Sequence, residues 1–190
     1  MQTHTPETAP AASLDAFNSL INAFGWSPNV LGVFAGSPVL IQSYYALSGI
    51  INSHSAFTEA EREIIQIANN IENDCTYCMA AHSTVVQMKE LFPEDQLQAL
   101  RTGAPLAESK HEALRTFALA VLKNQGRVSP AELETFKAAG YSDEHALETI
   151  LHSAFKVITN FTNNMANPAL DEPFAAQEWS KGTCSASSSC

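Results

Sequence analysis

Residues 58–82 read TEAEREIIQIANNIENDCTYCMAAH, and this stretch predicts two helices joined by a tight turn. Thr58 and Glu61 have the spacing of a capping box, in which the hydroxyl and the acid each accept a hydrogen bond from the backbone at the helix start. Asp74 then caps a second helix over about residues 75–90, and the break folds the two helices against each other. The first helix has apolar residues at helical spacing: Ile64, Ile65, Ile67, Ala68 and Ile71.

The rest of the chain also predicts helices. Strand signals are nearly absent, with no Asn-Gly or Asp-Gly hairpin and no sustained alternation. We predict an all-α, single-domain bundle of roughly seven or eight helices over residues 13–175. A mobile arm is expected at residues 1–12, and a Ser-rich tail at residues 176–190, where Cys184 and Cys190 lack activating neighbours. The other expected helix starts are Ser13, Ser37-Pro38, Pro93, the capping boxes Ser109–Glu112 and Ser129–Glu132, and Ser142.

Composition narrows the functional classes. Of the 190 residues, 45 % are apolar and 16 % charged, as in a globular protein with much buried surface. The net charge of −10 repels phosphate backbones and anionic lipids, which argues against nucleic-acid and membrane partners. No apolar run is long enough to span a membrane, and the first residues do not form a secretory signal. We therefore expect a cytoplasmic protein, where paired cysteines are more often catalytic or metal-binding than structural.

The two cysteines and the histidine of the opening stretch have the spacing of a reactive site. If Cys75 begins a helix, Cys78 lies one turn later, where the free amides and the helix dipole stabilise a thiolate. The spacing also lets the two sulfurs meet, so one thiol can trap the oxidised form of the other. His82 lies on the same helix face as Cys78 and is a candidate acid–base partner. Glu63 borders the apolar face of the preceding helix, and we predict that it contacts and orients His82.

These residues form a recognisable pattern: Glu63, eleven residues, Cys75-Thr-Tyr-Cys78, three residues, His82. It resembles the core motif of the alkylhydroperoxidase D-like proteins, which belong to the carboxymuconolactone decarboxylase superfamily. The likeness extends over roughly residues 15–175. Two further segments are similar to the peroxidase-related branch of that superfamily: PNVLGVFAGSPVLIQSYYAL at residues 28–47 and ITNFTNNMANPALDEP at residues 158–173.

The resemblance implies an all-helical fold, a homo-oligomer of two, three or six chains, and antioxidant reduction of hydroperoxides by a thiol–disulfide cycle. By the motif, Cys78 attacks the peroxide, Cys75 resolves the oxidised sulfur, and Glu63 and His82 relay protons. An external dithiol or a redox adaptor protein then restores the thiols. The chain has no Gly-rich nucleotide fingerprint, so no bound flavin or nicotinamide is expected. Well-studied members have a histidine where this chain has Tyr77, which can donate a hydrogen bond but cannot shuttle protons near neutral pH.

Other interpretations of these side chains stay open. A thiol–disulfide oxidoreductase with little peroxidase activity would use the same cysteine pair. A non-catalytic helical assembly could use the thiols as a redox sensor, or bind zinc through Cys75, Cys78, His82 and Glu63. We expect no metal, because closed zinc sites usually draw their ligands from two separated segments. The cysteines could also be small apolar core residues. Lactone decarboxylation is disfavoured because it needs no thiol pair.

The last predicted helix has polar residues among its apolar ones. His145 and His152 lie seven residues apart, and we expect them at the surface or at a subunit contact. Asn160, Asn163 and Asn164 follow an apolar run, where they would cap the helix or bind across an interface.

Overall fold

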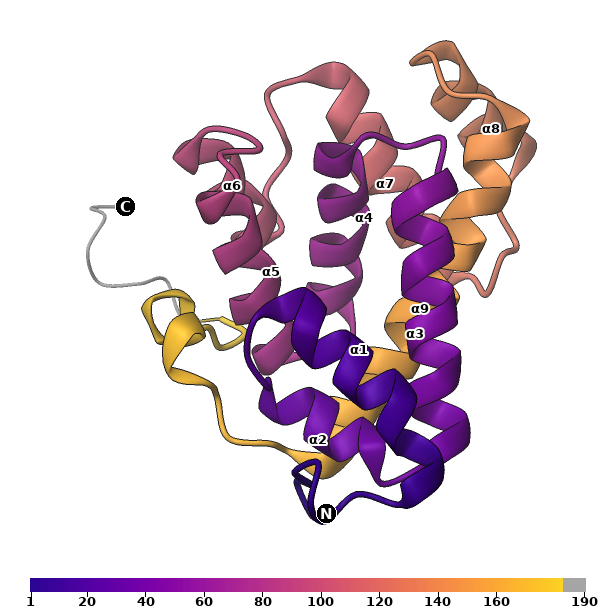
Figure 1. Cartoon of the computed structure of the whole chain (residues 1–190). Helices are drawn as coiled ribbons and strands as arrows, with labels where there is room; N and C mark the ends of the chain where they lie inside the picture. Colours follow the sequence, from indigo (N-terminus) through magenta and orange to yellow (C-terminus); the bar gives the residue numbers. More distant parts are fainter. Residues whose placement is uncertain (183–190) are drawn as a thin grey trace.

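The computed structural model describes residues 1–182 and confirms the all-α fold class (Figure 1). Over these residues it has nine α-helices, two 3₁₀ helices and no strand, and none of its helices combines the length and apolarity needed to cross a membrane. The α-helices are α1 (Leu14–Phe24), α2 (Asn29–Ala35), α3 (Pro38–His54), α4 (Glu59–Glu72), α5 (Thr76–Met88), α6 (Glu94–Thr102), α7 (Ser109–Lys123), α8 (Pro130–Ala138) and α9 (Asp143–Ala166). The 3₁₀ helices are η1 (Ala11–Ser13) and η2 (Glu172–Gln177).

Helix α4 lies at the centre of the bundle, and α5, α6, α7 and α9 all pack against it (Figure 1). Its apolar side chains Ile64, Ile65 and Ile67 are fully buried. The Thr58 hydroxyl accepts a hydrogen bond from the Glu61 amide, and the Glu61 carboxylate accepts one from the Thr58 amide. The capping box predicted here is thereby confirmed, and it fixes where the central helix begins.

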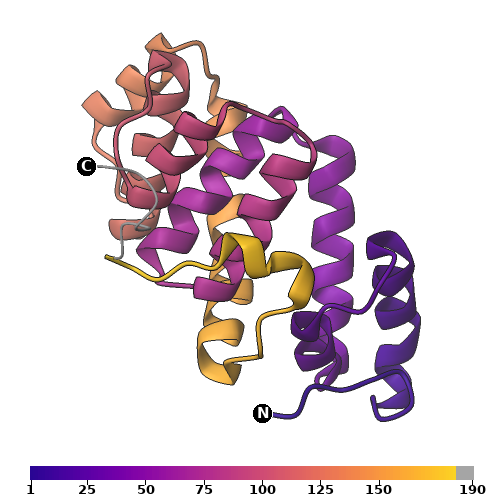
Figure 2. The ribbon, with the colours of Figure 1, turned by 90° about the vertical axis from the view of Figure 1, so that its left-hand side faces the viewer.

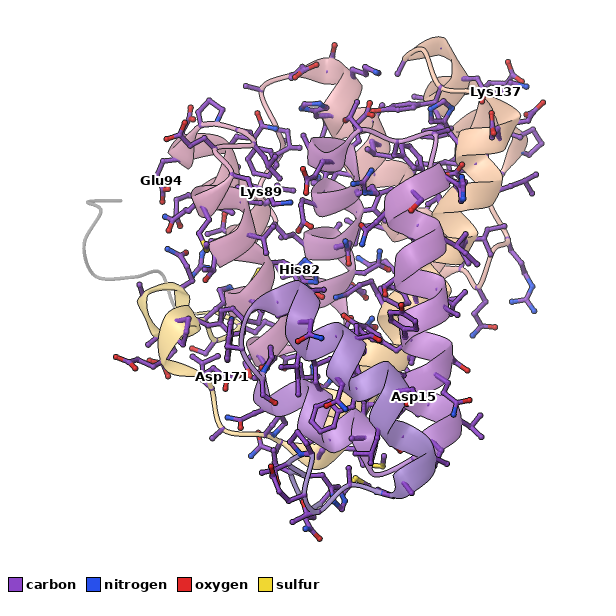
Figure 3. All side chains as sticks on the ribbon, viewed as in Figure 1. Asp15, His82, Lys89, Glu94, Lys137 and Asp171 are labelled. Atoms are coloured by element: carbon purple, nitrogen blue, oxygen red, sulfur yellow. The ribbon has the colours of Figure 1, made fainter. Side chains whose placement is uncertain are left out.

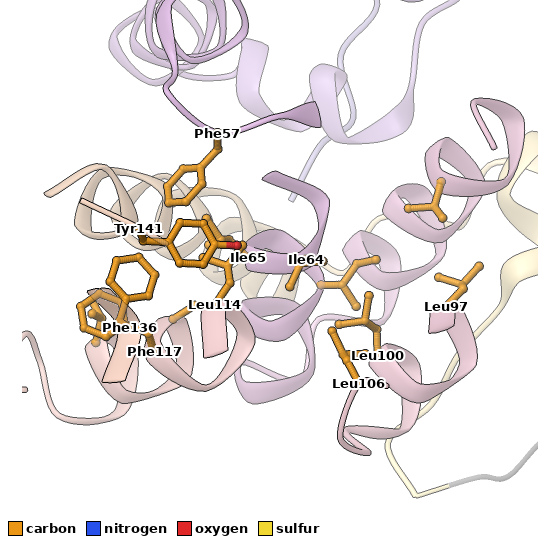
Figure 4. Packing of buried hydrophobic residues seen from close by; sticks show 14 of the residues in the cluster. Phe57, Ile64, Ile65, Leu97, Leu100, Leu106, Leu114, Phe117, Phe136 and Tyr141 are labelled. Carbon is orange, nitrogen blue, oxygen red and sulfur yellow. The ribbon is translucent and has the colours of Figure 1, made fainter. Parts of the chain in front are cut away.

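An aromatic stack forms one end of the main apolar core (Figure 4). The ring of Phe136 stacks on Phe117 at 4.0 Å and on Tyr141 at 4.5 Å. Phe57 tilts against Tyr141 at 5.9 Å, which ties the loop before α4 to the stack. Burial of one large apolar side chain stabilises a fold by about 1.5–3 kcal/mol, so the core holds α4–α8 together. Aliphatic members of this core include Ile64, Leu97, Leu100, Leu106 and Leu114.

Helices α1–α3 form a second layer on one side of the molecule, with an apolar cluster of their own (Figure 2). Phe17, Leu31 and Phe34 are buried within it. The cluster joins the rest of the chain through Tyr44 of α3, whose ring stacks on Phe155 of α9 at 5.2 Å. Helix α9 is therefore shared by both layers.

Three further predicted helix starts are confirmed. Ser129 forms a capping box with Glu132 at the start of α8. Ser142 forms one with His145 at the start of α9. Ser37 caps α3 just before its first residue, a proline.

The capping box predicted at Ser109–Glu112 is wrong. Helix α7 begins at Ser109 itself, with Glu108 at the N-cap position and no side-chain bond there. Glu112 instead accepts hydrogen bonds from Arg115 at 2.6 Å and from the Leu106 amide at 2.8 Å. The Glu112 carboxylate is thus bonded within α7 and to the preceding loop, and it does not accept a hydrogen bond from the N-cap backbone of α7.

Helix α2 was not predicted, because its supports come from distant parts of the chain. It follows Pro28, which offers no side-chain cap. Its first amide, that of Asn29, donates to the Asp171 carboxylate at 3.1 Å. At its other end the Ala35 carbonyl accepts from the Ser13 hydroxyl at 2.7 Å, so Ser13 does not cap α1 as predicted.

Both predicted flanks of the bundle make contacts in the part that is described. The His4 amide donates to the Gly32 carbonyl at 3.0 Å. A Cβ at Gly32 would lie 2.5 Å from the His4 carbonyl oxygen, so this close approach requires glycine. At the other flank, Trp179 Nε1 donates to the Arg101 carbonyl at 2.9 Å. The two tail cysteines lie outside the described residues.

Candidate active site

The turn between α4 and α5 sets the geometry of the cysteine pair. Asp74 adopts a left-handed conformation with φ of 51°. Its amide donates to the Ile71 carbonyl, and the Cys75 amide donates to the Asn70 carbonyl. These two bonds form a Schellman ending of α4. Because Asp74 belongs to that ending, the prediction that it caps α5 is wrong.

Cys75 is itself the N-cap of α5. Its sulfur accepts a hydrogen bond from the Cys78 amide at 3.4 Å, which makes Cys78 the third residue of the helix. Both are free thiols, and their exposed fractions are 0 % for Cys75 and 4 % for Cys78. The helix starts one residue later than predicted, but both sulfurs lie at its N-terminus, where the helix dipole favours negative charge.

Several neighbouring side chains favour the thiolate form of Cys78. Asn163 of α9 donates from Nδ2 to Cys78 Sγ at 3.0 Å. Burial raises the pKa of Cys78, but the hydrogen bond from Cys75, the charge of Lys156 and the bond from Asn163 outweigh it and bring the pKa below that of an ordinary thiol. The hydrogen bond to Cys78 and burial raise the pKa of Cys75. These shifts favour Cys78 as the thiolate of the pair and Cys75 as the thiol.

His82 lies near the middle of the molecule (Figure 3), and both of its ring nitrogens are engaged. Nδ1 lies 2.7 Å from Glu63 Oε2, which confirms the contact predicted from the sequence. On the other side of the ring, Lys156 Nζ lies 2.9 Å from Nε2. A lysine ammonium only donates and a carboxylate only accepts, so these bonds place the ring proton on Nδ1 and make Nε2 the acceptor.

Lys156 is a site residue that the sequence analysis missed. Its exposed fraction is 1 %, which is unusual for a lysine. The signal that could have found it is a stripe of polar residues in α9, in which His152, Lys156, Asn160 and Asn163 recur at helical spacing. All four are buried, so the polar face of α9 points into the molecule.

This inward polar face also explains why the surface position expected for His152 is wrong. Its exposed fraction is 1 %, and its ring packs edge-on against Phe57 at 5.8 Å. Burial lowers the pKa of His152 to about 4, against the opposing charge of Glu148 and with help from Arg62. The ring is therefore neutral near pH 7. Its Nε2 lies 3.5 Å from Ser55 Oγ, and Nδ1 has no hydrogen-bond partner within the described residues.

The asparagines of α9 bind within the chain to the end of α4. Asn160 donates to Asn70 Oδ1 at 2.9 Å and accepts from Asn73 Nδ2 at 3.0 Å. Asn164 donates to the Asn73 carbonyl at 2.7 Å. These bonds, with that of Asn163 to the sulfur, hold the cysteine turn against α9. These bonds to α4 and to the sulfur differ from the capping role expected for the three asparagines, and binding across an interface stays a prediction.

Tyr77 connects α5 to the segment that follows α9. Its hydroxyl donates to the Asp171 carboxylate, and the Val30 amide approaches the same hydroxyl at 3.5 Å. Burial and the hydrogen bond to Asp171 raise the pKa of Tyr77 well above that of a free phenol. The ring also meets the edge of Phe174 at 5.8 Å. Tyr77 therefore donates the hydrogen bond expected of it and keeps its proton at neutral pH.

A metal site does not fit this geometry. Within residues 1–182, no group of three or more His, Cys, Asp or Glu side chains is arranged to hold a metal ion. Both nitrogens of His82 are already occupied, by Glu63 and by Lys156. A zinc ion would have to displace one of these bonds and lie beside the lysine ammonium.

Comparison with known proteins finds a family match for the middle of the chain. Residues 38–123, which span α3–α7 and hold both cysteines, match the model of the Carboxymuconolactone decarboxylase family. Over that segment, which is somewhat less than half of its length, the chain is similar to the carboxymuconolactone decarboxylase family. The matched residues include the central helix α4 and the whole cysteine motif at the start of α5. No protein of curated function matches the chain.

Solved structures share the fold of this chain. The alkylhydroperoxidase AhpD core of an uncharacterized peroxidase-related protein from Ralstonia eutropha JMP134 is 24 % identical, with a TM-score of 0.79 over 92 % of this chain and 93 % of that one. A peroxidase-related protein from Silicibacter sp. TM1040 is 20 % identical, with a TM-score of 0.72 over 88 % and 89 %. The debrominase Bmp8, in complex with 2,3,4-tribromopyrrole, is 16 % identical, with a TM-score of 0.68 over 86 % and 87 %.

Proposed function

We propose that the protein is a peroxidase-type oxidoreductase with an antioxidant role, which reduces hydroperoxides through a thiol–disulfide cycle. The observation that carries this proposal is a pair of buried free cysteines one turn apart, in which Asn163 Nδ2 donates to Cys78 Sγ at 3.0 Å. The family match of residues 38–123 and the fold shared with peroxidase-related proteins support it.

The proposed reaction needs only the two sulfurs, a peroxide and an external dithiol. The Cys78 thiolate attacks one peroxide oxygen, so an S–O bond forms, the O–O bond breaks and sulfur loses two electrons. The leaving oxygen takes up a proton and departs as alcohol or water. The Cys75 thiol then attacks the Cys78 sulfenic acid, which releases water and leaves a disulfide. A dithiol, free or on a redox adaptor protein, restores both thiols by exchange.

In this proposal Glu63 and His82 carry protons between the site and solvent. The exposed fractions of their side chains are 8 % for Glu63 and 21 % for His82, whereas Cys78 is almost completely covered. A partly exposed ring beside a buried sulfur is a suitable route for the protons that the cycle takes up and releases.

Burial of the cysteines favours a small substrate over a protein disulfide. Both sulfurs belong to residues with exposed fractions of 4 % or less, so a large partner cannot reach them without rearrangement. A small hydroperoxide requires less space. This observation favours the peroxidase over the alternative of a thiol–disulfide oxidoreductase with protein substrates. A redox adaptor protein would restore the thiols only after a rearrangement that exposes the disulfide, whereas a small free dithiol requires less space.

We also propose that the protein forms a homo-oligomer. Because the polar face of α9 points inward, apolar side chains lie on its outer face: Leu147, Ile150, Phe161 and Met165 are all exposed. A continuous apolar face on a long helix favours association with another copy of the chain. A reducing compartment such as the cytoplasm fits the free thiols, which the cycle requires.

The test of this function follows peroxide consumption in a Cys184→Ser, Cys190→Ser background, which also serves as the reference protein. With a dithiol reductant and hydrogen peroxide or cumene hydroperoxide, Cys78→Ser should lower the rate to that of the reductant alone. Cys75→Ser should allow one turnover and leave a sulfenic acid that dimedone traps at Cys78. Turnover that survives in Cys78→Ser would refute the scheme.

A further inference from the structure

A buried cation lies beside the cysteine pair and has no role in the cycle described above. Lys156 has an exposed fraction of 1 %, and lysine is rarely buried to this extent unless it is paired. Its Nζ lies 2.9 Å from Nε2 of His82, whose Nδ1 lies 2.7 Å from the Glu63 carboxylate. The three side chains thus form a line of ammonium, neutral ring and carboxylate.

The same two helices that place this cation also place the reactive sulfur. At one point of the α5–α9 contact Asn163 donates to Cys78, and at the other Lys156 donates to His82. Cys78 and His82 are four residues apart on α5, and Lys156 and Asn163 are seven apart on α9, so each pair shares a helix face. The lysine therefore belongs to the interface that holds the Cys78 sulfur.

Of the charges that lower the pKa of Cys78, that of Lys156 has a larger effect than that of His82. Burial raises the pKa of Tyr44 to about 12 and raises that of Tyr77, while it lowers the pKa of His152 to about 4. These three groups are therefore neutral near pH 7. The hydrogen bonds of His82 describe a neutral ring as well. The titratable and charged groups around the interface include Tyr44 of α3, Arg62 and Glu63 of α4, Cys75 before α5, Tyr77, Cys78 and His82 of α5, Glu148, His152 and Lys156 of α9, and Asp171 after α9.

We propose that Lys156 is a positioning residue of this site: its ammonium holds His82 in the neutral, Nδ1-protonated form and stabilises the Cys78 thiolate across the α5–α9 contact. Without Lys156, two anions, Glu63 and Cys78, would share a buried region with no cation between them, and the sulfur would keep its proton. The catalytic meaning of this role rests on the proposed peroxidase function, but the thiolate can be measured without any turnover.

The first experiment measures the pH dependence of Cys78 alkylation by iodoacetamide, with the modified residue identified by mass spectrometry. Lys156→Met keeps an unbranched side chain that is only one atom shorter and removes its charge. The midpoint of alkylation should rise by roughly 1–3 pH units, the range for loss of a close opposite charge. Lys110→Met is the matched control, because Lys110 also pairs with a buried carboxylate of α4, at 2.9 Å from Glu61, and should leave the midpoint unchanged.

The second experiment distinguishes this role from an imidazolium–thiolate pair by its sign. If Glu63 stabilised a positive His82 that in turn stabilised the thiolate, Glu63→Gln would raise the alkylation midpoint of Cys78. With the positive charge on Lys156, Glu63→Gln removes a competing anion, and the midpoint should stay or fall. This variant also decides the question if Lys156→Met does not fold.

The outcomes separate the two proposals. An unchanged midpoint in folded Lys156→Met, or a raised midpoint in Glu63→Gln, would overturn the role of Lys156, whatever the peroxidase assay shows. Wild-type protein without peroxide turnover would refute the proposed function, yet a shifted midpoint in Lys156→Met would still establish that the lysine controls the Cys78 thiolate.

Discussion

Asn160→Ala should loosen the attachment of α9 to the turn that holds the cysteines. The side chain is fully buried and forms two hydrogen bonds, one to Asn70 Oδ1 and one from Asn73 Nδ2. Alanine offers neither bond. The end of α4, and with it the position of Cys75, then depends on the remaining contacts of the turn.

The expected loss of stability follows from the burial of the two partners. Asn70 is fully buried, and its Nδ2 already lacks a partner within the described residues, so loss of Asn160 leaves its whole side-chain amide unbonded. Such a buried group costs about 1–3 kcal/mol. Asn73 is half-buried, so water can replace its lost partner, and this bond contributes about 0.5–1.5 kcal/mol. We expect a total of about 2–4 kcal/mol, or roughly 4–16 °C in Tm for a chain of this length.

Thermal unfolding followed by circular dichroism, at one fixed protein concentration, measures this loss. Asn164→Ala is the matched control, because Asn164 lies one turn later on the same helix, is exposed, and donates one bond to the Asn73 carbonyl at 2.7 Å. It should cost no more than about 1 kcal/mol. A Tm for Asn160→Ala within about 2 °C of wild type, or a larger loss for Asn164→Ala, would refute the reasoning about the buried amides.

Two further predictions concern the start of α4 and the outer face of α9. Burial raises the pKa of Glu61, but bonds from Lys110 and the Thr58 backbone and hydroxyl outweigh it and bring the pKa to about 2. Since a free glutamate titrates near roughly 4.3, this carboxylate stabilises the fold above that pH, and the contribution is lost as the pH falls toward about 2. Between roughly pH 4.3 and about pH 2, the free energy of unfolding measured with urea should therefore change less with pH in Glu61→Gln than in the wild type. An equal pH dependence in the two proteins would contradict this prediction. Phe161→Asp should reduce the oligomer size seen by light scattering and leave the fold intact, and a wild-type monomer would disprove the association.

The helix pair at the centre of the fold could be predicted because its signals are local. Thr58 and Glu61 mark the start of α4, and both the Glu63–His82 contact and the cysteine spacing follow once two helices turn back on each other. The error at Asp74 was also local. A residue between two helices can end the first or begin the second, and only the backbone bonds decide between these roles.

Other parts of the site depend on how distant helices cross. Asp171 supports the start of α2 and binds Tyr77, and neither partner is near it in the sequence. Helix α9, which contains Lys156, has enough apolar residues to form a buried face of its own. Its sequence alone therefore suggests that its lysine and amide side chains point to solvent. The helix has the opposite orientation, because α4 and α5 present Glu63, His82 and the cysteine turn, which need polar partners.

The orientation of α9 also connects the site to the assembly that we propose. A helix that turns Lys156 and Asn163 inward must turn Phe161 and Met165 outward, since the two sets occupy opposite faces. In an isolated chain, rotation of α9 that buried these apolar side chains would withdraw the cation and the amide from Cys78. A second copy of the chain on the outer face would remove the tendency to rotate. Association and thiolate stability should therefore be coupled, so that dilution to monomers raises the pH at which Cys78 becomes reactive.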